Sequence, residues 1–147
     1  MEIGKAINSK FTDVHQKVAV NIRYTSNWMA SIQHTYMSKF GLTMPQFNIL
    51  RILRGAKKEL NVNTIKERMV EKSPNTTRLM DKLIQKELIE RVRCDSDRRV
   101  VYVNITSKGL DLLKKIDVDF EESFLISNNL TTQEAESLSQ LLDKLRG

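Results

Sequence analysis

The chain has 147 residues, of which 40% are hydrophobic and 29% charged, a composition that fits one folded domain with a core and excludes a disordered protein. The formal net charge of +6 favours a negatively charged partner. No apolar run approaches the ~20 residues that span a membrane, residues 1–11 lack the apolar core of a signal peptide, and the single cysteine excludes an internal disulfide. We therefore expect a cytoplasmic protein.

The basic charge is concentrated in the first two thirds of the chain. Residues 1–60 carry 9 basic and 3 acidic side chains, residues 61–99 carry 10 and 7, and residues 100–147 carry 5 and 8. An anion-binding surface is therefore expected in the first two segments and not in the last.

The first 60 residues predict two helices. Apolar residues recur at spacings of three and four from about Thr12 to Phe40, which indicates one long amphipathic helix ended by Gly41. The sequence from Thr43 to Gln46 has the pattern of a capping box with proline in the first turn, and the helix that it opens stops near Gly55.

A helix-turn-helix is predicted next. A short helix over 61–70 is followed by Ser73, which is expected to cap a second helix with Pro74 at its first position. Helical spacing gives this second helix an inward side, formed by Thr76, Met80, Leu83 and Ile84. The same spacing leaves an outward side suited to a DNA groove, formed by Asn75, Arg78, Lys82 and Gln85.

A β-hairpin follows the second helix. Residues 88–93 and 100–105 are alternating or β-branched runs, and the turn between them includes Asp97, Arg98 and Arg99. A groove-entering helix followed by an arginine-tipped hairpin predicts a winged helix-turn-helix over residues 43–105. The fold class is mainly α with a small β-hairpin wing.

The last 41 residues predict two more helices. Thr106 is expected to cap a helix, and Thr131 to Glu134 has the pattern of a capping box. The apolar stripes of these helices are Leu113, Ile116, Phe120 and Phe124 in the first, and Leu138, Leu141, Leu142 and Leu145 in the second. A winged-helix unit of about half the chain is too small to cover these stripes and that of the first helix. We therefore expect a homodimer joined through residues 1–40 and 107–147, within a single domain of residues 1–147.

The order of the elements and the hairpin sequence resemble the MarR (multiple antibiotic resistance regulator) family of bacterial transcription factors. The wing pattern of that family is an Asp, any residue, an Arg, and then a strand that ends in Leu-Thr-x-x-Gly. Here the pattern stands as Asp97, Arg99 and the sequence Ile-Thr-Ser-Lys-Gly over residues 105–109. The resemblance covers nearly the whole chain.

The resemblance implies a DNA-binding site. Arg99 would enter the minor groove, with Asp97 orienting it, while Asn75, Thr77 and Arg78 would contact the major groove or phosphates. The full expected set is Ser73, Pro74, Asn75, Thr77, Arg78, Lys82, Asp97, Arg98 and Arg99. The chain departs from the family at Glu87, where relatives often have a glycine, so the corner after the second helix is expected to turn differently.

Several side chains have two interpretations. Trp28, Met29 and Tyr36 are either core residues or, as the resemblance implies, the border of a small-molecule pocket. Cys94 is either an inert strand thiol or a redox-sensitive group whose cationic neighbours lower its pKa. His15 and His34 have no companions at ligand spacing, so no metal is expected, and no cofactor either.

The predicted function is that of a sequence-specific transcription regulator. We expect a ligand-responsive repressor that binds, as a homodimer, a pseudo-palindromic stretch of double-stranded DNA. The alternative is a winged-helix module that binds an acidic protein surface. The sequence has no phosphate-binding glycine loop, no metal-ligand cluster and no nucleophile beside a base, so an enzyme is not expected.

Overall fold

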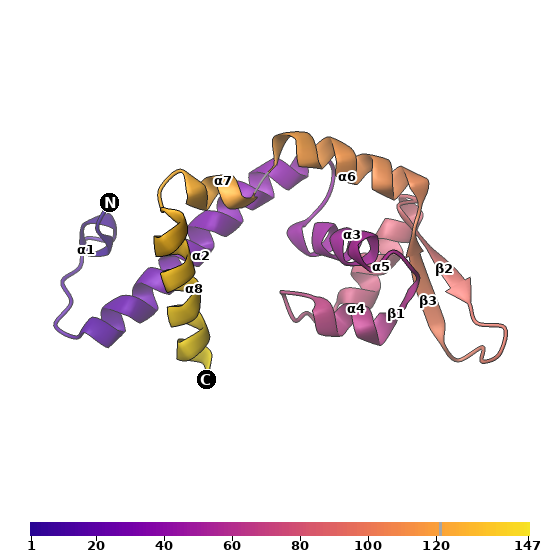
Figure 1. Ribbon diagram of the computed structural model, residues 1–147, viewed down its shortest axis with the longest axis horizontal. Coiled ribbons are helices and arrows are strands. Elements are labelled where there is room, and N and C mark those ends of the chain that lie inside the picture. Colours follow the sequence, from indigo (N-terminus) through magenta and orange to yellow (C-terminus); the bar gives the residue numbers. More distant parts are fainter. Residues whose placement is uncertain (121) are drawn as a thin grey trace. The chain divides into compact units, whose positions relative to one another are not determined.

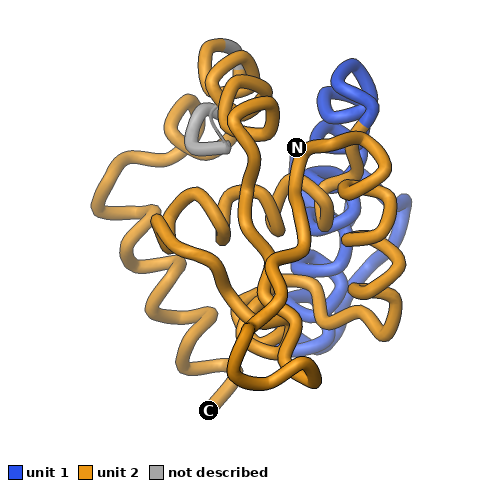
Figure 2. Tube along the Cα trace, turned by 90° about the vertical axis from the view of Figure 1, so that its right-hand side faces the viewer, with its two compact units in different colours: residues 1–41 blue, residues 42–147 orange. Residues whose placement is uncertain are grey.

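The computed structural model describes residues 1–120 and 122–147, which form eight helices and a three-stranded sheet (Figure 1). Residues 1–41 make one compact unit and residues 42–147 a second (Figure 2). This mainly helical fold with a small sheet confirms the predicted fold class. None of the described helices is long and apolar enough to cross a membrane.

The first unit contains α1, Ile3–Ala6, and α2, Val14–Ser38. The predicted long helix is confirmed as α2, whose first turn is capped by the Asp13 carboxylate. The short α1 was not predicted, because four residues are too few to show a helical period. It is tied to α2 by an ion pair of 2.7 Å between the Glu2 carboxylate and Lys17 Nζ.

The second unit holds the core of the molecule. In chain order it contains α3 (Met44–Ala56), β1 (Leu60–Asn61), α4 (Val62–Arg68), α5 (Thr76–Gln85), β2 (Ile89–Arg93), β3 (Val101–Ile105) and α6 (Ser107–Asp119). The capping box predicted at the start of α3 is present, since the Thr43 hydroxyl and the Gln46 side chain bond each other's backbone N–H groups. α3 contacts α4, α5, α6 and β3, and its buried side chains are Gln46, Phe47, Ile49, Leu50 and Leu53.

The sheet has the antiparallel order β1-β3-β2. The hairpin of β2 and β3 was predicted, whereas β1 was missed because a two-residue strand shows no alternation. β1 pairs only with the middle of β3, at Leu60↔Val103 and Asn61↔Tyr102. The outer part of the hairpin is therefore two-stranded, and its turn projects away from α3, α4 and α5 (Figure 1).

The chain ends in α7, Glu122–Ser127, and α8, Thr132–Arg146. The predicted capping box at the start of α8 is present, with bonds in both directions between Thr131 and Glu134. No residue of α8 is buried, and Leu141 and Leu145 are 64% and 63% exposed. The side chain of Phe124, predicted to lie in an apolar stripe, falls outside the described residues.

Candidate nucleic-acid interface

The helix predicted to enter a groove, α5, begins two residues later than expected. Its N-cap is Asn75 and not Ser73, so the predicted Ser73 cap with Pro74 at the first helical position is wrong. The Ser73 hydroxyl instead accepts the backbone N–H of Asn75 at 3.1 Å, and the Ser73 carbonyl accepts the Thr76 hydroxyl at 3.0 Å. Because the Ser73 hydroxyl binds the N–H of Asn75, which precedes the first residue of α5, residues 74–75 form a turn before the helix.

The two faces of α5 are those that the sequence predicts. Thr76, Met80 and Leu83 are buried against the rest of the second unit. All four residues of the predicted outward side are exposed: Asn75, Arg78, Lys82 and Gln85. Pro74 and Thr77 are also exposed, whereas Ser73 is half-buried. α5 therefore presents an amide, a hydroxyl and two cations to solvent, the groups that pair with base edges and phosphates.

Two side chains that sequence reasoning missed fix the turn between α4 and α5. Asn48 of α3 accepts the backbone N–H of Val70 through its side-chain oxygen at 3.0 Å. Lys72 donates from Nζ to the Lys66 carbonyl at 3.3 Å, at the C-terminal end of α4. The Asn48 bond spans 22 residues, and no local pattern in the sequence could have indicated it.

The corner after α5 keeps the left-handed turn that a glycine would take, so the expectation that Glu87 would change it is wrong. Glu87 has φ of 60°. Its N–H donates to the Ile84 carbonyl at 2.8 Å, and the N–H of Leu88 donates to the Leu83 carbonyl at 3.0 Å, the paired bonds of a Schellman motif. The buried Leu83 and Leu88 accompany the motif, so tertiary packing outweighs the cost of φ at this residue.

The Thr-Ser-Lys-Gly sequence at 106–109 fastens this corner to α6. The Thr106 hydroxyl donates to the Glu87 carbonyl at 2.7 Å and accepts the Gly109 N–H at 3.1 Å, while the Thr106 N–H donates to the Leu88 carbonyl at 3.1 Å. A Cβ on Gly109 would lie 2.3 Å from the Leu88 carbonyl oxygen. The glycine is therefore required by close approach of the two backbones.

The hairpin turn is shaped by Asp97. One carboxylate oxygen of Asp97 accepts the backbone N–H of Arg99 at 3.0 Å, and its carbonyl accepts the N–H of Val100 at 3.1 Å. Asp97 thus acts on the backbone of Arg99. The side chains of Arg98 and Arg99 are exposed at the tip of the hairpin.

Two further arginines, which the sequence analysis passed over, lie on the inner face of the hairpin. Arg91 and Arg93 alternate with the buried Ile89 along β2, so all three share a face. Arg91 forms an ion pair with Asp81 of α5. A hollow of about 510 Å³ lies here, lined by Thr77 and Met80 of α5, by Arg91, Arg93 and Arg98, and by Val62, Val100, Val101 and Val103.

Cys94 follows β2 directly and has a pKa below the ordinary value of a thiol. The Ser96 hydroxyl, 3.0 Å from Sγ, is the largest cause, followed by the backbone N–H groups of Asp97 and Ser96. The Asp97 carboxylate opposes the shift. The redox-sensitive interpretation attributed a lowered pKa to cationic neighbours, whereas hydrogen bonds to the thiolate are the cause.

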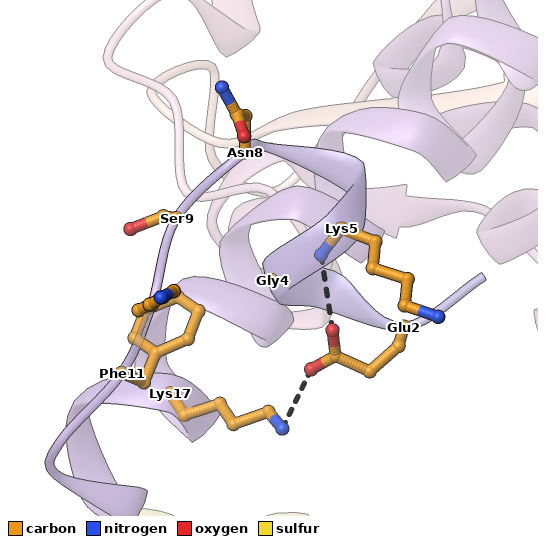
Figure 3. Close-up of a pocket in the computed structure, with 8 residues that line it drawn as sticks. Glu2, Gly4, Lys5, Asn8, Ser9, Phe11 and Lys17 are labelled. Carbon is orange, nitrogen blue, oxygen red and sulfur yellow. Dashed lines mark hydrogen bonds and ion pairs between the residues drawn. The ribbon is translucent and has the colours of Figure 1, made fainter.

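The first unit has a hollow of its own, about 610 Å³, between α1 and the start of α2 (Figure 3). The Glu2 carboxylate lies there between the Lys17 ammonium and the Lys5 backbone N–H, as Figure 3 shows. The bond from Lys17 and the N–H groups of Gly4 and Lys5 lower the pKa of Glu2 to about 2. Glu2 therefore neutralises one of the three lysines that line this hollow, Lys5, Lys10 and Lys17.

The three residues of the predicted ligand pocket lie on α2. Trp28 is 45% exposed, whereas Met29 and Tyr36 are half-buried. The Tyr36 ring lies 5.5 Å from that of Phe40, and Lys39 Nζ lies 5.2 Å from its centroid. Their role in binding a small molecule stays a prediction.

Comparison with known proteins identifies the family. A family model described as the MarR family matches residues 42–101, which run from just before α3 into β3. The HTH-type transcriptional regulator MhqR of Bacillus subtilis is 33% identical over 112 residues, 75% of this chain and 76% of that protein.

Solved structures show the same fold. A MarR transcription factor from Planctomyces limnophilus matches with a TM-score of 0.69 and 29% identity, over 91% of this chain and 98% of that one. A mutant of MarR from E. coli, solved in complex with operator DNA, matches with a TM-score of 0.77 and 24% identity, over 91% and 99% of the two chains. The resemblance seen in the sequence is confirmed, and the chain belongs to the MarR family of winged helix-turn-helix transcription regulators.

Proposed function

We propose that the chain regulates transcription by binding double-stranded DNA in a sequence-specific manner, with α5 in a major groove and the β2–β3 hairpin in the adjacent minor groove. The observation that supports this most is the exposure, on one winged-helix unit, of Arg78 and Lys82 from α5 and of Arg98 and Arg99 at the hairpin tip. The E. coli MarR mutant, which has this fold, was solved in complex with operator DNA, and this supports double-stranded DNA as the partner. Membership of a family of regulators also confirms that the chain is not an enzyme.

The proposed contacts divide by chemistry. Asn75, Thr77 and Arg78 are assigned to base edges, because an amide and a guanidinium form bidentate pairs with adenine and guanine. Lys82 and Arg98, with the turn at Ser73 and Pro74, are assigned to phosphates, which set register and contribute the salt-dependent part of the affinity. Arg99 is assigned to the minor groove, on a turn that Asp97 holds.

The regulator is proposed to act as a homodimer in the cytoplasm. α8 exposes Leu138, Leu141 and Leu145, and α2 exposes Val14, Val18 and Ile22, each set at the spacing of one helix face that a partner subunit would cover. A two-fold dimer would present two α5 helices about 34 Å apart, one turn of DNA, and so select a pseudo-palindrome.

Release from DNA is proposed to follow from a small-molecule effector near Trp28, Met29 and Tyr36. A ligand that binds better to a dimer whose α5 helices are wrongly spaced lowers the DNA affinity by its differential binding energy. The chain would then act as a repressor. The alternative, a winged-helix module for an acidic protein surface, is less well supported, because the relatives are named transcriptional regulators.

Selection of bound fragments from random duplex DNA tests the proposal. The expected result is an inverted repeat whose half-site centres lie about one helical turn apart. Recovery of unrelated sequences without symmetry would contradict the sequence-specific dimer and favour the protein-interaction module.

The wing contact has its own test. Arg99→Ala is expected to weaken binding to the selected duplex by about 1–3 kcal/mol, because a groove contact is lost. Lys115→Ala, which removes the same charge from α6 outside the proposed surface, is the control and is expected to have a much smaller effect. Equal affinities of the Arg99→Ala variant and the parent protein, measured by titration of labelled duplex, would remove Arg99 from the interface.

A further inference from the structure

We infer that Asp81 and Arg91 are positioning residues: their ion pair holds the hairpin at the angle to α5 from which its tip can reach the groove beside the one that α5 occupies. The inference rests on the proposed function. It concerns two residues outside the proposed set of DNA contacts, which lie ten positions apart in the sequence, one on α5 and the other on β2.

The location of the pair follows from the strand geometry. Ile89 is buried at the root of β2, and Arg91, two residues further toward the tip, points from the same face. Arg91 lies opposite Val103, which is also buried, so its guanidinium starts from the inner face of the sheet and reaches across to the Asp81 carboxylate of α5. The pair therefore ties β2, an edge strand of the sheet, to α5 at the level of the buried Val103.

The position of the outer hairpin depends on how the part of β2 below it is held. β1 supports β3 only at Tyr102 and Val103, so the Arg93↔Val101 pair and the turn beyond it belong to a two-stranded ribbon. A two-stranded hairpin alone is marginally stable in water. Without the pair, small rotations at the corner near Glu87 would be carried along the ribbon to Arg99, which lies up to ~20 Å from Ile89 at the rise of an extended strand.

The negative charge of Asp81 also supports a role in holding the hairpin. A carboxylate on a helix that faces DNA repels phosphates, and Asp81 lies one helical turn from Arg78 and next to Lys82. Its charge is offset by Arg91, so α5 keeps a cationic outward face while the carboxylate serves the hairpin. Removal of the Asp81 carboxylate would relieve its repulsion of phosphates and would also release the hairpin. Hydrogen exchange of the free protein reports the release alone, and binding to duplex DNA reports both effects.

Amide hydrogen exchange of the free protein tests the hold on the hairpin without DNA. Asp81→Asn is expected to speed exchange in residues 92–101 by about fivefold or more, with α3 unchanged, because local opening of the hairpin becomes easier. Arg91→Gln should give the same change, and the double variant should add little. The control is Asp117→Asn, which breaks an Arg–Asp pair of the same kind between α3 and α6, Arg54 Nη1 to Asp117 Oδ2 at 2.6 Å. Exchange in the hairpin of Asp81→Asn that matches the control would overturn the inference.

Binding to the selected duplex tests the consequence for the wing. The Arg99→Ala penalty, expected to be about fivefold or more in the parent protein, should shrink to less than about twofold in the Asp81→Asn background and remain unchanged in the Asp117→Asn background. The same penalty in all three backgrounds would overturn the inference. If Arg99→Ala binds as tightly as the parent protein, the proposed wing contact is contradicted instead. The hydrogen exchange result alone would then decide whether Asp81 holds the hairpin.

Discussion

At the scale of single residues, the backbone junction around residues 87–109 shows why particular side chains stand where they do. Thr106 serves both as the cap of α6 and as a donor to the Glu87 carbonyl, and Gly109 lets the Leu88 carbonyl approach. The Thr-x-x-Gly pattern of the family therefore has a physical reason in this chain. It joins the corner after α5 to the first turn of α6, and so fixes the root of the hairpin.

Gly109→Ala is expected to lower the free energy of unfolding by about 2 kcal/mol or more, because its Cβ would lie 2.3 Å from the Leu88 carbonyl oxygen and the backbones must separate. Gly55→Ala is the matched control. No atom lies within 4 Å of the Cβ that it adds, and alanine in a helix gains about 0.5–1 kcal/mol over glycine. Urea unfolding measures both. Equal stability of the Gly109→Ala variant and the parent protein would contradict the close approach.

The lowered pKa of Cys94 leads to a prediction about the pH dependence of its reactivity. Since the Ser96 hydroxyl and two backbone N–H groups favour the thiolate, the pKa is lowered, and thiolate accumulates at a lower pH than in an ordinary cysteine. The rate of alkylation by iodoacetamide should therefore rise with pH at a midpoint below that of a model thiol. Ser96→Ala should move that midpoint upward. If the midpoints of the parent protein and the variant coincide, the hydroxyl is not the cause.

At the scale of elements, periodicity and capping patterns predicted the features that depend on neighbouring residues, such as helix faces and helix caps. Features that depend on contacts between separate segments were not predicted. The faces of α5 and the caps of α3 and α8 followed from spacings of three and four residues. The start of α5 was misplaced because Ser73 has two competing amide partners, and only the fold selects between them. β1 and the Asn48 bond depend on segments far apart in the sequence that folding brings together, and the Asp81–Arg91 pair depends on how the hairpin folds back on α5, which no helical or strand period indicates.

The corner after α5 gives a prediction at this scale. Glu87→Gly is expected to raise the free energy of unfolding by about 0.5–1 kcal/mol, because glycine adopts φ of 60° without strain, while the exposed pair with Lys108 that is lost contributes little. Glu90→Gly, at an exposed position of β2 with ordinary strand geometry, should destabilise instead. Thermal or urea unfolding of the two variants gives the comparison, and a loss of stability in Glu87→Gly would contradict the left-handed corner.

At the scale of the whole molecule, assembly and DNA binding are assigned to different parts of the chain. The acidic and apolar C-terminal helix is proposed to join the dimer, and the basic winged-helix unit is proposed to bind DNA. Leu141→Glu is expected to shift the protein toward monomer, since in the proposed dimer a charge would replace an apolar residue that the partner covers. Gln140→Glu adds the same charge at the neighbouring exposed position of α8 and should leave the dimer intact. Sedimentation velocity reports the outcome, and a parent protein that sediments as a stable monomer would rule out the dimer.

Equilibrium binding to the selected duplex and to a scrambled duplex of the same composition, repeated over a range of salt concentrations, tests the central claim most directly. We expect the affinity for both duplexes to fall steeply as salt rises, and the selected duplex to bind about a thousandfold tighter or more at physiological salt. Equal affinity for the two duplexes, or no measurable binding to either, would contradict sequence-specific recognition by α5 and the hairpin.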